Sequence, residues 1–222
     1  MKNLTAAVLK SPNAPDVLRD LQKALHEEMR RRHDFGEWID ETLKAEFING
    51  EAVVHSPVKR KHWQSSNFLS TLLSVYTTLH NLGTVGVEKV MIALTRNDYE
   101  PDIVFFSLAK AALFETNQMF FPAPDLVVEI LSKKTANRDK GIKKEDYAAH
   151  GISEYWIIDP EKQLVEQFLL LQKTDTNYSQ PSVFSIHDDI ESRSVEGFKI
   201  PVRAIFEQEA NAETLKSFFE KK

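Results

Sequence analysis

The chain has 222 residues, of which 42% are hydrophobic and 27% charged, and these proportions exclude a wholly disordered protein. It contains no cysteine, which excludes disulfide bonds, thiolate metal sites and cysteine nucleophiles. Its formal net charge of −5 argues against a protein that coats DNA through bulk positive charge. No apolar run approaches the ~18 residues of a membrane span, so we expect a cytoplasmic protein without a membrane partner.

The first elements in chain order are an arm, a helix and a hairpin. Residues 1–14 show little periodicity and are expected to form a flexible N-terminal arm, before a single domain over residues 15–222. From Asp16 to about Arg32 the apolar residues recur at helical spacing. The segment Lys44–Val54 predicts a β-hairpin, because the turn pair Asn49-Gly50 separates two apolar runs.

The rest of the chain predicts strands interrupted by helices. In order, these are a helix over about 61–82 that Gly83 would cap, strands over 84–94, 102–106 and 126–131, a helix over about 137–150, strands over 155–158, 164–171, 178–186 and 198–200, and a short helix over 212–219. This order indicates an α/β or α+β fold, in which a mixed β-sheet is flanked by helices.

Two of these strands carry acidic residues at positions that packing alone would not select. Asp102 follows Pro101 at the start of an apolar strand, although Pro-Asp pairs also form ordinary turns. Glu129 lies inside the apolar run Leu126–Leu131, which predicts a strand buried on both faces. An unpaired buried carboxylate costs several kcal/mol, so Glu129 needs a cation, a network of hydrogen-bond donors or a proton. A metal ion or a lysine would meet this need; the alternatives are a side chain that bends to the sheet edge or pairs with an architectural arginine.

The helix that follows supplies a cation. Asp139, Lys143 and Tyr147 are spaced by four and therefore share one helical face. Because the Tyr147 ring should pack against the sheet, we expect Lys143, rather than the lysines beside it, to point at Asp102 and Glu129. We also expect Lys143→Ala to leave folding largely intact. The alternative is that Lys143 is a solvated surface residue.

Basic residues cluster near both candidate acids. Residues 133–144 hold six basic side chains and one acid, and Lys59-Arg60-Lys61-His62 forms a second group. Contact with phosphate would explain these groups, and so would two solvated charged faces. Other catalytic motifs are absent from the sequence: the seven histidines lack metal-binding spacing, and no P-loop, nucleophile elbow or dinucleotide-binding fingerprint occurs.

In this order the motifs resemble the Uma-two (Uma2) family of restriction endonucleases, a branch of the PD-(D/E)xK nuclease superfamily. The resemblance spans about residues 46–206. It is carried by the hairpin 46–51, His62 at the start of a long helix, Pro101-Asp102, the run 124–132, Arg138-Asp139, Lys143, Tyr147, Gly151 and the run 154–160.

The resemblance implies a restriction-endonuclease-like core, a mixed sheet with helices on both faces and a group of acidic residues at one end of the sheet. In it, Asp102 and Glu129 would hold a divalent metal, Mg²⁺ or Mn²⁺, and Lys143 would assist the attacking water. A standard motif would place this lysine at the position of Leu131, so Lys143 would supply it from the next helix. Glu51 resembles the additional early acid of such enzymes.

Two further assignments complete the expected site and its partners. Asp125 is a further possible metal ligand, because it shares strand parity with Glu129. The resemblance implies a metal-dependent DNA endonuclease that hydrolyses phosphodiester bonds and acts as a homodimer, with the strands between Leu164 and Ile200 in the interface. The alternatives are a catalytically silent nucleic-acid-binding or dimeric interaction module on the same fold, which the acidic net charge and the displaced lysine favour, and hydrolysis of another phosphate ester.

Overall fold

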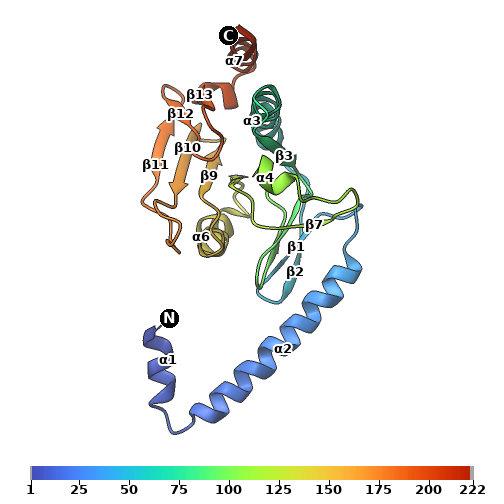
Figure 1. Cartoon of the computed structure of the whole chain (residues 1–222), viewed down its shortest axis with the longest axis vertical. Coiled ribbons are helices and arrows are strands. Elements are labelled where there is room, and N and C mark those ends of the chain that lie inside the picture. The colour runs from blue at the N-terminus through green and yellow to red at the C-terminus, as the bar shows by residue number, and fades with distance from the viewer. Residues whose placement is uncertain (1, 221–222) are drawn as a thin grey trace. The chain divides into compact units, whose positions relative to one another are not determined.

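In the computed structural model, which describes residues 2–220, the chain divides into two compact units, Met1–His55 and Ser56–Lys222 (Figure 1). The expected division into an arm over residues 1–14 and one domain over residues 15–222 stays a prediction. Within the described residues, no helix combines the length and the apolar character needed to cross a membrane.

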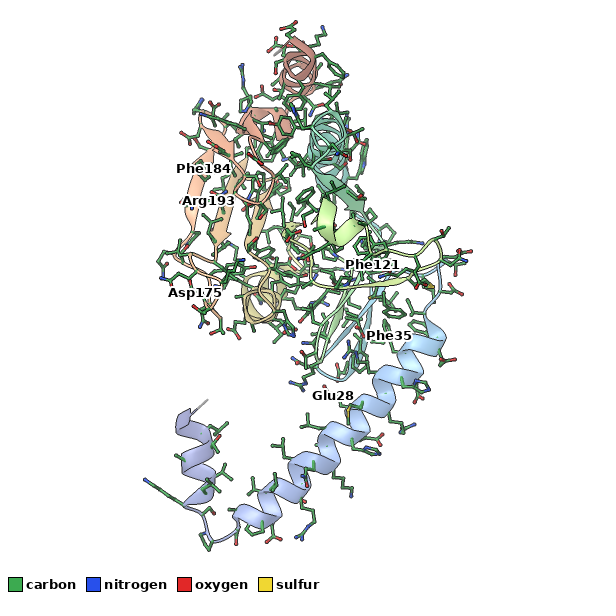
Figure 2. The ribbon with its side chains drawn as sticks, viewed as in Figure 1. Glu28, Phe35, Phe121, Asp175, Phe184 and Arg193 are labelled. Atoms are coloured by element: carbon green, nitrogen blue, oxygen red, sulfur yellow. The ribbon has the colours of Figure 1, made fainter. Side chains whose placement is uncertain are left out.

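The first unit consists of two helices and a hairpin. Helix α1 (Lys2–Leu9) lies in the segment expected as an arm, and α2 (Ala14–Trp38) contains and extends the predicted helix. Strands β1 (Ala45–Ile48) and β2 (Glu51–Val54) pair antiparallel around Asn49 and Gly50, both with positive φ as a two-residue hairpin turn requires. Phe35, labelled on α2 in Figure 2, packs its ring 5.6 Å from that of Phe47 and joins the hairpin to the helix.

A six-stranded mixed sheet forms the centre of the second unit. Its spatial order is β11-β10-β9-β8-β6-β3. The strands are β3 (Gly83–Val87), β6 (Ile103–Ser107), β8 (Leu126–Ile130), β9 (Glu154–Asp159), β10 (Leu164–Leu169) and β11 (Ser182–Ser185). Only β8 and β9 pair in parallel, and the other neighbours are antiparallel. This is the mixed sheet flanked by helices that the sequence predicts.

Helices cover both faces of this sheet. On one face, α3 (Arg60–Leu79), the 3₁₀ turn η2 (Val202–Ile205) and α7 (Gln208–Glu220) pack on the main core, in which Leu72 and Leu73 meet Val128 and Trp156. On the other face lies α6 (Lys144–Ala149), where the ring of Tyr147 contacts that of Tyr155 at 5.2 Å. Strand β8 is therefore buried throughout, as its apolar run predicts.

The connecting elements are short. They are β4 (Met91–Ala93), β5 (Asp98–Tyr99), α4 (Leu108–Ala111), β7 (Phe120–Phe121), α5 (Ala136–Arg138), the helical turn η1 (Asp139–Lys143), β12 (Asp189–Glu191) and β13 (Lys199–Pro201).

Three predicted elements end or break differently in the structure. The run predicted as one strand over 84–94 divides into β3 and β4, because Glu88 and Lys89 adopt positive φ between them. Gly83 starts β3 instead of capping α3; a Cβ there would lie 2.1 Å from the Phe106 carbonyl oxygen, so only glycine permits this approach. The helix predicted over 137–150 is kinked at Gly141, whose φ of −109° and ψ of −108° are not helical.

Candidate active site

Asp102 and Glu129 come from neighbouring antiparallel strands. Ile103 of β6 pairs with Val128 of β8, so residues 102 and 129 are the next opposed pair, and opposed residues share a face of the sheet. Oδ2 of Asp102 accepts the backbone N–H of Ile130 at 2.7 Å. Both carboxylates are buried, with 6% and 5% of each residue exposed, so each needs compensation from its surroundings.

Lys143 provides part of that compensation. Its Nζ donates to Oε1 of Glu129 at 2.8 Å and lies 3.7 Å from Oδ1 of Asp139. The hydroxyl of Tyr147, one helical turn later, donates to the same Glu129 oxygen at 3.0 Å. Lys143 is 2% exposed and is not a solvated surface residue. The spacing by four thus places Lys143 and Tyr147 on the same oxygen of Glu129, although the helix is kinked at Gly141, between Asp139 and Lys143.

The structure adds two side chains for which the sequence predicted no role in the site. Nε2 of His62, in the first turn of α3, lies 3.3 Å from Oδ2 of Asp102. Asp139 is 1% exposed and faces Lys143. Asp139 could have been found, because it shares the helical face of Lys143 and Tyr147. No spacing rule connects His62 to Asp102, because their contact depends on how α3 packs.

Tyr155 of β9 is a neutral hydrogen-bond donor close to the acidic residues of the site. Its hydroxyl donates to the backbone carbonyl of Asp139 at 3.1 Å. Complete burial raises the pKa of Tyr155 well above its usual value, and the negative charges of Glu129, Asp139 and Asp102 raise it further. The phenol therefore stays protonated at neutral pH and cannot serve as a base.

The other two acids expected in the site lie elsewhere. Asp125 stands at the opposite end of the β6–β8 pair from Asp102; it accepts the N–H of Ser107 at 2.7 Å and lies 2.9 Å from Nζ of Lys110. The structure thus does not bring Asp125 to Asp102. Glu51 is exposed on β2 of the first unit, and its participation stays a prediction.

Lysines converge near the end of the sheet where β8 and β9 finish. Lys61 donates to Glu161, just beyond β9, at 2.8 Å and lowers the pKa of that carboxyl. The charges of Lys59 and Lys133 lower it further, so positive charge from both basic segments acts on Glu161. Lys140, by contrast, pairs with Glu166 at 2.7 Å.

The donor set suits a hard divalent cation. Glu129 and Asp139 both lie within 4 Å of the Lys143 ammonium, and the negative charges of Asp102, Glu129 and Asp139 all act on Tyr155, so additional positive charge is compatible with the site. Among residues 2–220 no group of three or more His, Cys, Asp or Glu side chains is arranged to hold a metal ion. Asp102 and Glu129 therefore fit an ion such as Mg²⁺, which needs only one or two carboxylates and keeps much of its water.

Comparison with known proteins places this site in a family context. A model of the Uma2 family, described as "Putative restriction endonuclease", matches residues 32–203. The structure resembles that of a protein from Anabaena variabilis, described as a putative nuclease belonging to DUF820, with a TM-score of 0.67 and 18% identity over 82% of this chain and 96% of that one. This likeness shows a shared fold. No curated protein matches the chain. The family match covers most of the sequence, and the chain belongs to the Uma2 family.

Proposed function

We propose that this protein is a metal-dependent DNA endonuclease that hydrolyses phosphodiester bonds at the Asp102–Glu129 site. The observation that carries the proposal is the buried contact of Lys143 with Glu129 at 2.8 Å, on the strand next to that of Asp102. A buried cluster of acids with a lysine is costly to fold, and such clusters concentrate at functional sites. Family membership and fold support the assignment to nucleases.

Asp102 and Glu129 would hold the metal, with Mg²⁺ or Mn²⁺ as the candidates. When bound there, such an ion lowers the pKa of a coordinated water and stabilises the charge that develops on phosphate oxygens. The chain's own contribution is to fix the two carboxylates. The N–H of Ile130 orients Asp102, and the hydroxyl of Tyr147 orients Glu129.

Lys143 fixes a positive charge beside the carboxylates. Its contacts with Glu129 and Asp139 hold the ammonium in place, and a preorganised charge stabilises a developing negative charge without reorganisation. We assign to it the orientation of the attacking water or the scissile phosphate. The lysines around Glu161 would contact the DNA backbone on either side, because phosphate contacts position a nucleic acid without reading its sequence.

A homodimer is part of the proposal, because cutting two strands requires two sites and a two-fold axis supplies them. Strand β11 is short and lies at an edge of the six-stranded sheet. Most of its residues are exposed, and one of them is the apolar Val183. An exposed edge can pair with another chain. Light scattering at micromolar concentration tests this point, and a monomer would contradict it.

Plasmid cleavage in the presence of Mg²⁺ or Mn²⁺ tests the proposed activity. We expect the wild type and Lys144→Ala to cleave, and Lys143→Ala, assayed at a temperature at which circular dichroism shows it folded, to be inactive. Cleavage that survives in EDTA would contradict metal dependence. A wild type that binds DNA but cleaves none under any condition would favour the catalytically silent module.

A further inference from the structure

Trp63 is a large aromatic side chain that the fold leaves in solvent. It lies in the first turn of α3 and is 51% exposed, whereas Trp156 in the sheet is completely buried. Trp is usually highly buried, because it is large and mostly apolar. The Trp63 indole is therefore accessible to a ligand at the surface.

Trp63 follows a residue of the proposed nuclease site along the helix. The preceding residue, His62, reaches Asp102 at 3.3 Å, so the indole is one residue from a contact with a candidate metal ligand. Lys59 is the N-cap residue of α3, and its carbonyl accepts the Trp63 N–H at 3.3 Å. Lys61 and Lys59 both belong to the lysines that act on Glu161.

An exposed indole next to lysines matches the chemistry of unpaired nucleic acid. In single-stranded nucleic acid, phosphates that bind lysine alternate with bases whose faces can stack on an aromatic ring. In a duplex these faces are covered by neighbouring bases, and exposing one costs a few kcal/mol. An exposed indole one residue along α3 from His62 would therefore select substrates in which a base near the cut is already unstacked.

We infer that Trp63 stacks on an unpaired base next to the scissile phosphate, and that the substrate class is DNA with a single-stranded segment at the cutting site. This inference rests on the proposed nuclease function and deepens it. Trp63 acts in it as a specificity-determining residue, while the bond cleavage remains with Asp102, Glu129 and Lys143.

The test compares binding of two probes, a fluorescein-labelled oligothymidine and a hairpin duplex of equal length. Binding is measured by anisotropy in EDTA, so that no cleavage occurs. We expect Trp63→Ala to weaken oligothymidine binding by about 5- to 100-fold and duplex binding by less than about twofold. Trp63→Phe should restore most of the loss, because a phenyl ring still stacks. Trp38→Ala, which removes the half-exposed tryptophan of the first unit, serves as the matched control and should change neither affinity.

Each outcome separates this inference from the proposed function. Equal losses for the two probes, or no loss for either, would overturn the stacking role, even if plasmid cleavage by the wild type stands. A change in oligomeric state on Trp63→Ala, with unchanged oligothymidine affinity, would overturn it in favour of a protein contact. Conversely, a wild type that cleaves no DNA but prefers oligothymidine through Trp63 would contradict the nuclease assignment and leave the stacking role intact.

Discussion

Replacing Lys143 with methionine tests the central contact of the site through stability. The substitution keeps most of the side chain's length but removes the ammonium that lies 2.8 Å from Glu129 and 3.7 Å from Asp139. Removing one partner of a buried ion pair typically costs about 3–5 kcal/mol. For a protein of this size that loss lowers the Tm by roughly 6–20 °C. The sequence alone suggested that truncating Lys143 would leave folding largely intact; its 2% exposure changes that expectation.

The measurement is urea unfolding followed by circular dichroism in EDTA. Lys144→Met is the matched control, because Lys144 is the next residue and its Nζ lies 5.3 Å from the centre of the Phe168 ring, in a cation–π contact. Loss of that contact should cost less than about 1 kcal/mol. A Lys143→Met protein with the unfolding midpoint of the wild type would refute the buried ion pair and with it the proposed place of the third catalytic group.

Two further predictions concern metal and DNA. Asp102→Asn should weaken Mn²⁺ binding in calorimetry by at least about tenfold, because it removes a ligand charge, whereas Asp125→Asn at the other end of the strand pair should not. Lys133→Ala should reduce DNA affinity and the slope of its logarithm against log salt by about 0.7–0.9, the value of one phosphate contact. Lys173→Ala, beyond the opposite end of β10, is the control and should change neither quantity.

The sequence contains the local part of the site and lacks the part that depends on packing. An acid inside an apolar run and a lysine on the face of an inward tyrosine are local patterns, and they identify Glu129 and Lys143 as a pair. Side chains alternate between the faces of a strand, so Asp125 and Glu129 share a face. Four residues along a strand span about 13 Å, however, so the two side chains lie at opposite ends of the strand. The kink at Gly141 also escapes the pattern, because an isolated glycine is tolerated inside a helical period.

Neighbouring parallel strands contain two buried glutamates, and their partners separate a structural acid from a candidate functional one. Glu154 of β9 is fully buried, and both of its oxygens accept from neutral donors. Its Oε2 alone receives the Ser192 hydroxyl and the N–H groups of residues 193 and 194, which fixes that loop to the sheet. Glu129 of β8 instead receives a charged ammonium.

This contrast predicts opposite effects of the same substitution. Glu154→Gln would turn an amide NH₂ toward hydrogen-bond donors, so we expect it to lower the free energy of unfolding by at least about 2 kcal/mol, without changing Mn²⁺ binding. Glu129→Gln should abolish Mn²⁺ binding, because it removes one of two ligand charges. Urea unfolding and calorimetry on both variants decide the matter. The reasoning would be refuted by a folded Glu154→Gln protein that no longer binds Mn²⁺, or by a Glu129→Gln protein that still does. In either case, neutral donors or an ammonium beside a buried glutamate would not distinguish a structural acid from a metal ligand.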